Sequence, residues 1–208
     1  SHSMTNNKIG LDFFNKIINK DVIHFSKISG GCINECFKIE SNQKKYFIKI
    51  NSSFNPFNEE KKGLKLLEST NTFTIPKVYE VGVEKKTAFL LMEFIDGKIP
   101  SDDFWISFGY KLAKMHSHSN KFFGLDYNNY IGSLSQENTQ HHDAIEFFIN
   151  CRLLPQIRLI SKSSNNQLFK RFDKLFSKLS EIFPNDKPAL IRGDLWNGNF
   201  MVDTSGTP

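Results

Sequence analysis

"IRGDLWNGNF" (residues 191–200) places one aspartate, one tryptophan and two asparagines in a single short stretch. Asp194 and Asn199 are separated by four residues, and Gly193 directly precedes the aspartate, which suits a sharply turned loop. An aspartate carboxylate can accept the proton of a hydroxyl group, and an asparagine oxygen can bind a hard cation. The alternative is a pair of Asx turns in a surface loop. If the first interpretation is correct, the rest of the chain has to supply the other parts of a catalytic site.

The composition indicates a globular protein without a dedicated nucleic-acid surface. The chain has 208 residues, of which 39% are hydrophobic and 21 are phenylalanine, so one large domain or two small lobes can bury a core. The net charge of +5 comes from lysines scattered among acidic residues, a surface that tolerates anionic ligands without forming a basic block. We therefore expect no nucleic-acid partner.

The sequence contains no recognisable signal for export or membrane insertion. No stretch approaches the roughly 20 apolar residues that span a bilayer, and residues 1–4, "SHSM", have the character of a tag remnant. Cys32, Cys36 and Cys151 are odd in number and form no disulfide framework. We expect reduced thiols, a cytoplasmic protein and no membrane partner, and the sequence leaves the oligomeric state open.

The first half of the chain predicts an antiparallel sheet. An amphipathic helix over residues 8–20 comes first, and the hydrophobic pattern then changes to a period of two. Gly30 and Gly31 lie at the first turn, where backbone N–H groups can approach phosphates, although a plain hairpin turn would use the same residues. The expected strands, about five in all, lie within residues 22–28, 36–40, 46–50, 74–82 and 87–95.

A lysine and a glutamate in this half each need an explanation. Lys49, in "FIKI", faces away from Ile48 and Ile50 on its strand. In the helix predicted over residues 55–69, Glu60 lies on the apolar face. The ordinary interpretation is a surface lysine and a glutamate that reaches solvent. Because an unpaired buried charge is costly, a Lys49–Glu60 ion pair explains both residues better.

A connection between two lobes is expected near residue 95. "LLMEFIDG" (residues 90–97) ends a strand, and the backbone of Glu93 and Phe94 can bond the edge of an adenine ring, although a strand followed by a turn explains the same residues. We place a nucleotide-binding lobe over residues 1–95 and a helical lobe over residues 96–208.

The helical lobe is predicted from three apolar stripes. The stripes include Trp105 to Met115, Phe147 to Leu154, and Leu168 to Ile182, and a short strand is expected from residue 189 into the loop that contains Asp194. Arg152, in "NCRLLPQ", either braces this lobe or contacts a substrate.

Taken together, these parts resemble a kinase. A β-rich lobe with one helix, a short connector and a helical lobe suit an ATP site between two lobes, and the spacing of Asp194 and Asn199 occurs in the catalytic loop of protein kinases. More specifically, the chain resembles the fructosamine kinase (ketosamine kinase) family, because "GDLWNGN" (residues 193–199) has that family's tryptophan after Asp-Leu. "GGCINECF", "YFIKIN" and "FFINCRLLPQ" resemble further segments of the family, and the resemblance extends over residues 23–208.

The resemblance implies an α+β, protein-kinase-like fold of two lobes, with ATP and Mg²⁺ as cofactors. Asp194 would be the catalytic base, Asn199 a ligand of Mg²⁺, and Trp196 part of the ketosamine pocket. The residues implied in ATP binding are Gly30, Gly31, Cys32, Lys49, Glu60, Glu93 and Phe94. The implied reaction phosphorylates a sugar hydroxyl of a ketosamine, free or protein-linked, and is described as deglycation or protein repair.

Two departures from the family pattern keep other interpretations open. Arg192 stands where the family has a histidine that braces the loop, and arginine is longer and always charged. The family continues with an aspartate that binds magnesium, whereas this sequence ends at "MVDTSGTP", and Asp203 lies too close to Asn199 to replace it. We expect either a longer natural protein or an impaired catalyst. The alternatives are an aminoglycoside- or choline-type phosphotransferase and a non-catalytic ATP-binding pseudokinase.

Overall fold

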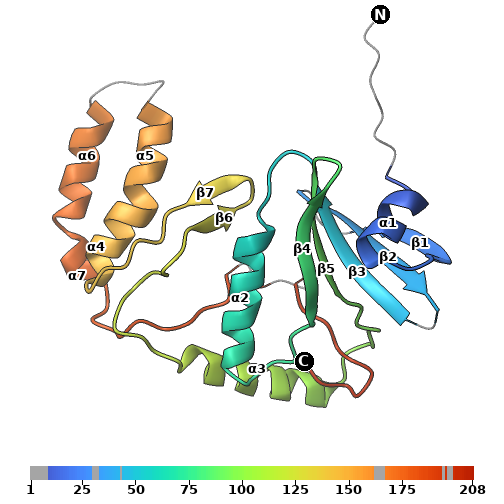
Figure 1. The fold of residues 1–208 in the computed structure, drawn as a ribbon. Coiled ribbons are helices and arrows are strands. Elements are labelled where there is room, and N and C mark those ends of the chain that lie inside the picture. Colours follow the sequence, from blue (N-terminus) through green and yellow to red (C-terminus); the bar gives the residue numbers. More distant parts are fainter. Residues whose placement is uncertain (1–8, 30–32, 43, 162–166, 194, 196–198) are drawn as a thin grey trace, which may run out of the picture.

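The computed structural model describes residues 9–29, 33–42, 44–161, 167–193, 195 and 199–208. A sheet with two attached helices forms one half of the molecule, and helices with a small hairpin form most of the other (Figure 1). The strands are β1 (His24–Ile28), β2 (Glu35–Ser41), β3 (Lys44–Asn51), β4 (Val78–Glu84), β5 (Thr87–Glu93), β6 (Asn129–Ile131) and β7 (Leu134–Gln136). The α-helices are α1 (Leu11–Ile18), α2 (Phe57–Ser69), α3 (Asp102–His116), α4 (Ala144–Phe148), α5 (Leu154–Ser161), α6 (Gln167–Phe176) and α7 (Leu179–Ile182), and η1 (Ile149–Leu153) is a π-helix between α4 and α5.

The sheet has five antiparallel strands in the order β1-β2-β3-β5-β4, which confirms the prediction from the hydrophobic pattern. Because successive side chains point to opposite faces, each strand contributes to two layers. On β3, Ile48 and Ile50 belong to one hydrophobic core, and Phe47 packs against a second. The sheet therefore separates two hydrophobic cores.

Helices α1 and α2 cover opposite faces of this sheet (Figure 1). From α1, Phe13, Phe14 and Ile17 lie in the first core, on the spacing of one helix face. From α2, Phe57 is fully buried in the second core and Leu64 packs against it. The face of β3 that carries Lys49 is consequently the face that α2 covers.

Local chemistry explains where these helices begin and end. Asn19, at φ 51°, adopts the left-handed conformation that terminates α1. Asn55 Oδ1 accepts a hydrogen bond from the N–H of Phe57 (3.2 Å), and Pro56 occupies the N-cap of α2. Helix α2 thus begins at Phe57, two residues after the start of the segment over which it was predicted.

Helix α3 crosses below the sheet (Figure 1) and starts at a serine N-cap. The Ser101 hydroxyl accepts a hydrogen bond from the N–H of Phe104 (3.3 Å). Phe104 and Met115 are the buried residues of this helix, whereas Trp105 is 47% exposed. At the N-terminal end of the predicted apolar stripe, the buried residue is therefore Phe104 and not Trp105.

The structure corrects the predicted helical half in two places. The strand expected from residue 189 is reduced to an isolated bridge between Ser119 and Ala189. The hairpin of β6 and β7 was not predicted, because its strands have three residues each and show no alternation of buried and exposed side chains. Strands this short carry too little pattern for detection from sequence.

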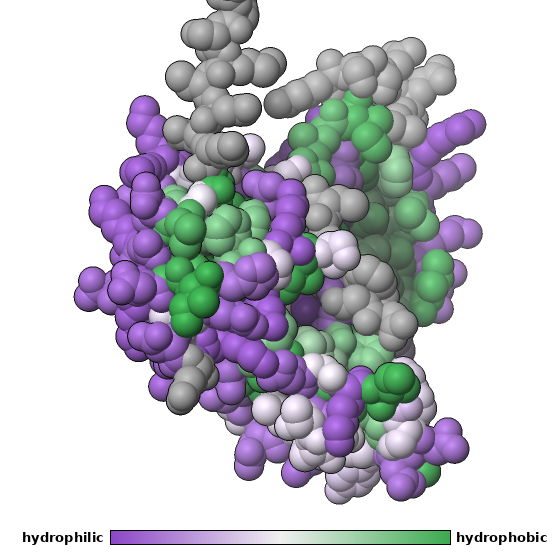
Figure 2. Space-filling model, turned by 90° about the vertical axis from the view of Figure 1, so that its right-hand side faces the viewer, coloured by the Kyte–Doolittle hydropathy of each residue, from purple (hydrophilic) through white to green (hydrophobic). Residues whose placement is uncertain are grey.

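Figure 2 shows the end of the molecule near α1 as largely hydrophilic, with hydrophobic residues in small groups. Within the described residues, no helix is long and apolar enough to cross a membrane.

Candidate functional site

The side chains of Lys49 and Glu60 meet between β3 and α2. Lys49 Nζ donates a hydrogen bond to Glu60 Oε1 at 2.5 Å. The two side chains are 26% and 27% exposed, so the pair is partly shielded and still reachable from solvent. The ion pair predicted from the strand and helix patterns is confirmed, and the assignment of either residue to nucleotide binding stays a prediction.

Cys36 lies beside this pair on the neighbouring strand. Its backbone is in register with Lys49, so the two side chains share a sheet face. Burial raises the pKa of the Cys36 thiol, and the nearby Lys49 ammonium offsets this only in part. The thiol is therefore protonated and behaves as a small apolar residue of the strand.

The predicted adenine-binding residues Glu93 and Phe94 lie at the end of β5. The Glu93 N–H donates to the Lys77 carbonyl (2.8 Å), and Glu93 Oε2 accepts from the Lys77 N–H (3.1 Å). The ammonium of Lys38 lies 5.0 Å from the centroid of the Phe94 ring. Because the Glu93 N–H is already bonded, an adenine edge at this position would have to use other backbone groups of the segment.

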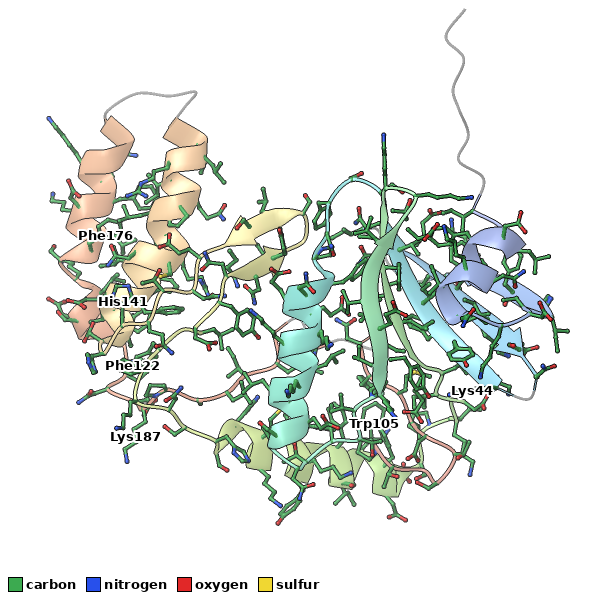
Figure 3. All side chains as sticks on the ribbon, in the orientation of Figure 1. Lys44, Trp105, Phe122, His141, Phe176 and Lys187 are labelled. Atoms are coloured by element: carbon green, nitrogen blue, oxygen red, sulfur yellow. The ribbon has the colours of Figure 1, made fainter. Side chains whose placement is uncertain are left out.

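Helix α3 anchors the chain on both sides of the loop that contains Asp194. Before the loop, the Leu190 N–H donates to the carbonyl of His118 (2.9 Å), two residues after the last residue of α3. After the loop, the Phe200 ring packs on Phe104 and Phe108 of α3, with centroids 6.0 and 4.9 Å apart. Figure 3 labels Trp105 on the same helix, and its ring lies 5.7 Å from the Phe200 ring. The loop is thus held against one helix at both of its ends.

A backbone contact also ties this loop to the connector that follows β5. The Lys98 N–H donates to the Val202 carbonyl (2.8 Å), and the Val202 side chain is 4% exposed. Gly97 lies against Met201: a Cβ atom at Gly97 would be 3.3 Å from Met201 Cε. The connector that follows β5 and the chain just after Asn199 therefore lie side by side.

Several predicted site residues fall outside the described part of the chain. These are Gly30, Gly31, Cys32, Asp194 and Trp196. Asn199 is described and its side chain is exposed, as is that of Arg192. No group of three metal-ligating His, Cys, Asp or Glu side chains is found among the described residues. Asn199, the residue predicted to bind magnesium, is thus described, and its role as a metal ligand stays a prediction.

Arg152 of the π-helix, for which the sequence left two roles open, braces the helical half. Its guanidinium donates to the carbonyls of Glu137 (2.7 Å) and Cys151 (2.8 Å) and to Asn138 Oδ1 (2.8 Å). It also lies 4.7 Å from the centroid of the Phe147 ring. The π-helix that positions Arg152 has no sequence signature, so the network itself could not be predicted.

Comparison with known proteins gives consistent matches over most of the chain. The sequence model of the family described as fructosamine kinase matches residues 12–208. The chain is 33% identical to a "probable ketoamine kinase" of Vibrio vulnificus, over 89% of this chain and 66% of that protein. It is 36% identical to the chloroplastic protein-ribulosamine 3-kinase of Oryza sativa subsp. japonica, over 88% of this chain and 56% of that protein. The chain thus spans less than two thirds of the length of either relative.

Solved structures show the same fold. The crystal structure of a protein assigned as a fructosamine-3-kinase, from Haemophilus somnus 129PT, superposes with a TM-score of 0.75 at 26% identity, covering 92% of this chain and 66% of that one. The aminoglycoside phosphotransferase APH(4)-Ia, in a ternary complex with AMP-PNP and hygromycin B, superposes with a TM-score of 0.64 at 12% identity, covering 94% of this chain and 67% of that one. The α+β, protein-kinase-like fold expected from the sequence is confirmed.

Proposed function

Because the chain belongs to the fructosamine kinase family, we propose that it takes part in transfer of the γ-phosphate of ATP to a sugar hydroxyl of a ketosamine. The observation that carries the proposal is the Lys49–Glu60 ion pair, formed at 2.5 Å on the sheet face covered by α2. An ion pair between the third strand and the following helix is the arrangement that positions ATP phosphates in protein kinases. We also place the boundary between nucleotide-binding and helical lobes at residues 95–96.

We assign the proton transfer to Asp194. Its carboxylate accepts the proton of the acceptor hydroxyl as the hydroxyl oxygen attacks the γ-phosphorus, and the bond to the β–γ bridging oxygen breaks to release ADP. Trp196, two residues further on, is assigned to the wall of the ketosamine pocket. The anchoring of this loop on α3 supports the assignment, because a base must be held in position to act.

The binding of ATP is assigned to groups from three segments. The Lys49 ammonium neutralises phosphate charge, and Glu60 holds that ammonium in place. Gly30, Gly31 and Cys32 contribute backbone N–H groups to the phosphates, and Glu93 and Phe94 border the adenine. The fold is shared with a phosphotransferase solved with the ATP analogue AMP-PNP, which supports ATP as the phosphate donor.

A magnesium ion fits the oxygen chemistry of Asn199. Mg²⁺ takes oxygen ligands, usually one or two carboxylates together with substrate phosphates and waters, so the Asn199 amide oxygen would supply one of its ligands. When bound, the ion supplies charge neutralisation on the phosphates.

The direct test is release of ADP in the presence of ATP and Mg²⁺. The acceptors compared are fructosyl-lysine, ribulosyl-lysine, an aminoglycoside and none, and the assay is run on this chain and on a version with the additional length of its relatives. Turnover that requires a ketosamine supports the proposal. Turnover only with the aminoglycoside, or ATP binding without turnover in either form, contradicts it.

We expect Asp194→Ala to lower kcat by about 100-fold or more while the affinity for ATP stays unchanged, because general-base losses have this size. The measurement pairs initial rates with calorimetric titration of a non-hydrolysable ATP analogue. Asp186→Ala, which removes an exposed carboxylate eight residues before Asp194 in the sequence, is the matched control and is expected to keep full activity. If the Asp194→Ala variant kept half of the kcat of the unmodified chain, another group would be the base.

A further inference from the structure

A cavity of about 370 Å³ lies between the β6–β7 hairpin and the helices η1 and α5. Its size falls within the range of small-molecule sites in proteins. Apolar side chains form part of the wall, and polar groups form the rest. The residues that matter for the argument are Ile131, Leu134, Gln136, Glu137, Arg152 and Gln156.

Arg152 gives this cavity a positive charge that its own contacts do not neutralise. Three of its five N–H groups are bonded, and all three acceptors are neutral oxygens. Within the described residues it forms no ion pair. Burial lowers the pKa of the guanidinium, and arginine remains charged even so. A partly buried cation with N–H groups to spare can bind an anion in the cavity.

The position of the guanidinium is fixed by its surroundings. Asn138, which is 2% exposed, accepts from Arg152 and donates from Nδ2 to the Tyr127 carbonyl (3.2 Å) and to Asn129 Oδ1 (2.8 Å). The π-helix adds a residue to the helical turn at this point, and such turns often occur at functional sites. The arrangement therefore holds the cation in a preformed orientation, which reduces the entropic cost of binding a ligand.

Glu137 supplies a negative charge on the same cavity wall. Its side chain is exposed, and Oε1 accepts a hydrogen bond from Thr139 Oγ1 (2.9 Å). The other carboxylate oxygen remains able to accept from a ligand. One fixed cation and one carboxylate in a single cavity complement a zwitterion, and the apolar Ile131 and Leu134 complement a methylene chain.

The hairpin that borders the cavity also contacts the start of the chain that leads into β2. The tip of the β6–β7 hairpin reaches the segment that follows Cys32: a Cβ atom at Gly132 would lie 3.5 Å from Ile33 Cδ1. The Tyr130 ring packs on Phe54 at 5.3 Å between centroids. Because Ile131 lines the cavity from the same hairpin, the cavity and the segment that begins at Ile33 lie against one hairpin.

We propose that this cavity binds the α-amino-acid head group of a free lysine ketosamine, with Arg152 on the carboxylate and Glu137 on the ammonium. The inference rests on the proposed function. The preferred acceptors are then ketosamines formed on the ε-amine of free lysine. A lysine within a protein chain carries neither the free carboxylate nor the free ammonium at its α-carbon. Gln136 and Gln156 offer amide groups to the same head group.

The test compares two acceptors that differ in one group, the ε-ketosamine of lysine and that of lysinamide. Loss of the carboxylate is expected to lower kcat/KM by about tenfold, mainly through KM, since the carboxylate is remote from the reacting hydroxyl. Gln156→Glu puts a competing carboxylate beside Arg152 from the exposed surface of α5, and it is expected to abolish the preference for lysine. Gln140→Glu adds the same charge at an exposed position outside the cavity and is expected to keep the preference.

A binding measurement separates this inference from the proposed reaction. Calorimetric titration of both ketosamines is carried out without ATP on the same three proteins. Carboxylate-dependent binding without turnover would contradict the kinase reaction and leave the cavity assignment standing. Equal kcat/KM for the two acceptors, or an unchanged preference in Gln156→Glu, would overturn the cavity assignment and leave the kinase reaction standing.

Discussion

Lys49 and Arg152 are both cationic, and their different surroundings give them different roles. Lys49 lies on a strand face that a helix covers, and its charge is compensated by Glu60 at 2.5 Å. Arg152 is held by neutral oxygens, so its charge remains available. A cation with a fixed counter-ion is positioned, and a cation bonded only to neutral oxygens attracts an anion. The two residues consequently suit different ligands, a polyphosphate and a single carboxylate.

At the residue scale, a double-mutant cycle tests the Lys49–Glu60 pair. Lys49→Met is expected to lower kcat/KM for ATP by about 100-fold and Glu60→Gln by about 10-fold, because the glutamate acts through the lysine. The double variant is then no worse than Lys49→Met alone.

The matched control is the Lys16–Glu84 pair (2.9 Å), which joins α1 to β4 at 66% and 16% exposure. Changes there are expected to leave kcat/KM for ATP unaltered. If the effects of Lys49→Met and Glu60→Gln simply multiplied, Glu60 would act independently of the lysine.

At the scale of single elements, the strength of the sequence pattern decided what could be predicted. β3 alternates between buried and less buried residues, β5 has a continuous apolar run from Ala88 to Met92, and both strands were predicted. The pairing of Lys49 with Glu60 followed from two residues that broke the pattern of their elements. β6 and β7 are too short to show a period, and the network around Arg152 depends on a π-helix that has no sequence signature of its own. The cavity bounded by these elements therefore could not be predicted from the sequence and became visible only in the structure.

The segment between α3 and β6 offers a test by glycine replacement. Gly124 has φ +99°, and a Cβ atom there would lie 2.5 Å from the Asn138 carbonyl oxygen. Gly124→Ala is expected to destabilise the protein by about 3 kcal/mol, since backbone strain and a backbone clash combine. Thermal unfolding measures the change.

Gly109→Ala, within α3, is the matched control, because a Cβ atom there would meet nothing within 4 Å. The expected change is a gain of about 0.5–1 kcal/mol from helix propensity. If Gly124→Ala left the stability of the protein unchanged, the loop would be able to move away from Asn138.

At the scale of the whole molecule, α3 connects the two halves to the loop between them. Before the loop, Leu190 bonds to His118, which directly follows the C-cap of α3. After the loop, the Phe200 ring packs on α3. Its N-terminal region also packs on the sheet half, where the Phe108 ring lies 5.4 Å from that of Phe73. Helix α3 therefore contacts both the sheet half and the chain on either side of the segment that contains Asp194.

Phe200→Ala tests this dependence. We expect a loss of about 2 kcal/mol in the free energy of unfolding, because a partly buried ring leaves the aromatic cluster of Phe104, Trp105 and Phe108. Urea denaturation measures the loss, and kcat is expected to fall with unchanged ATP affinity. Ile106→Ala, at a side chain 74% exposed on the same helix, is expected to change stability by less than about 0.5 kcal/mol.

The sheet with a core on each face also restricts how this chain can change over evolutionary time. Along β5, Phe89 and Leu91 belong to the core under α1, and Ala88, Leu90 and Met92 belong to the core under α2. Inserting or deleting one residue in β5 would exchange the two sets and place each in the wrong core. This strand can therefore diverge by substitution of side chains, and changes of length are confined to the loops around it.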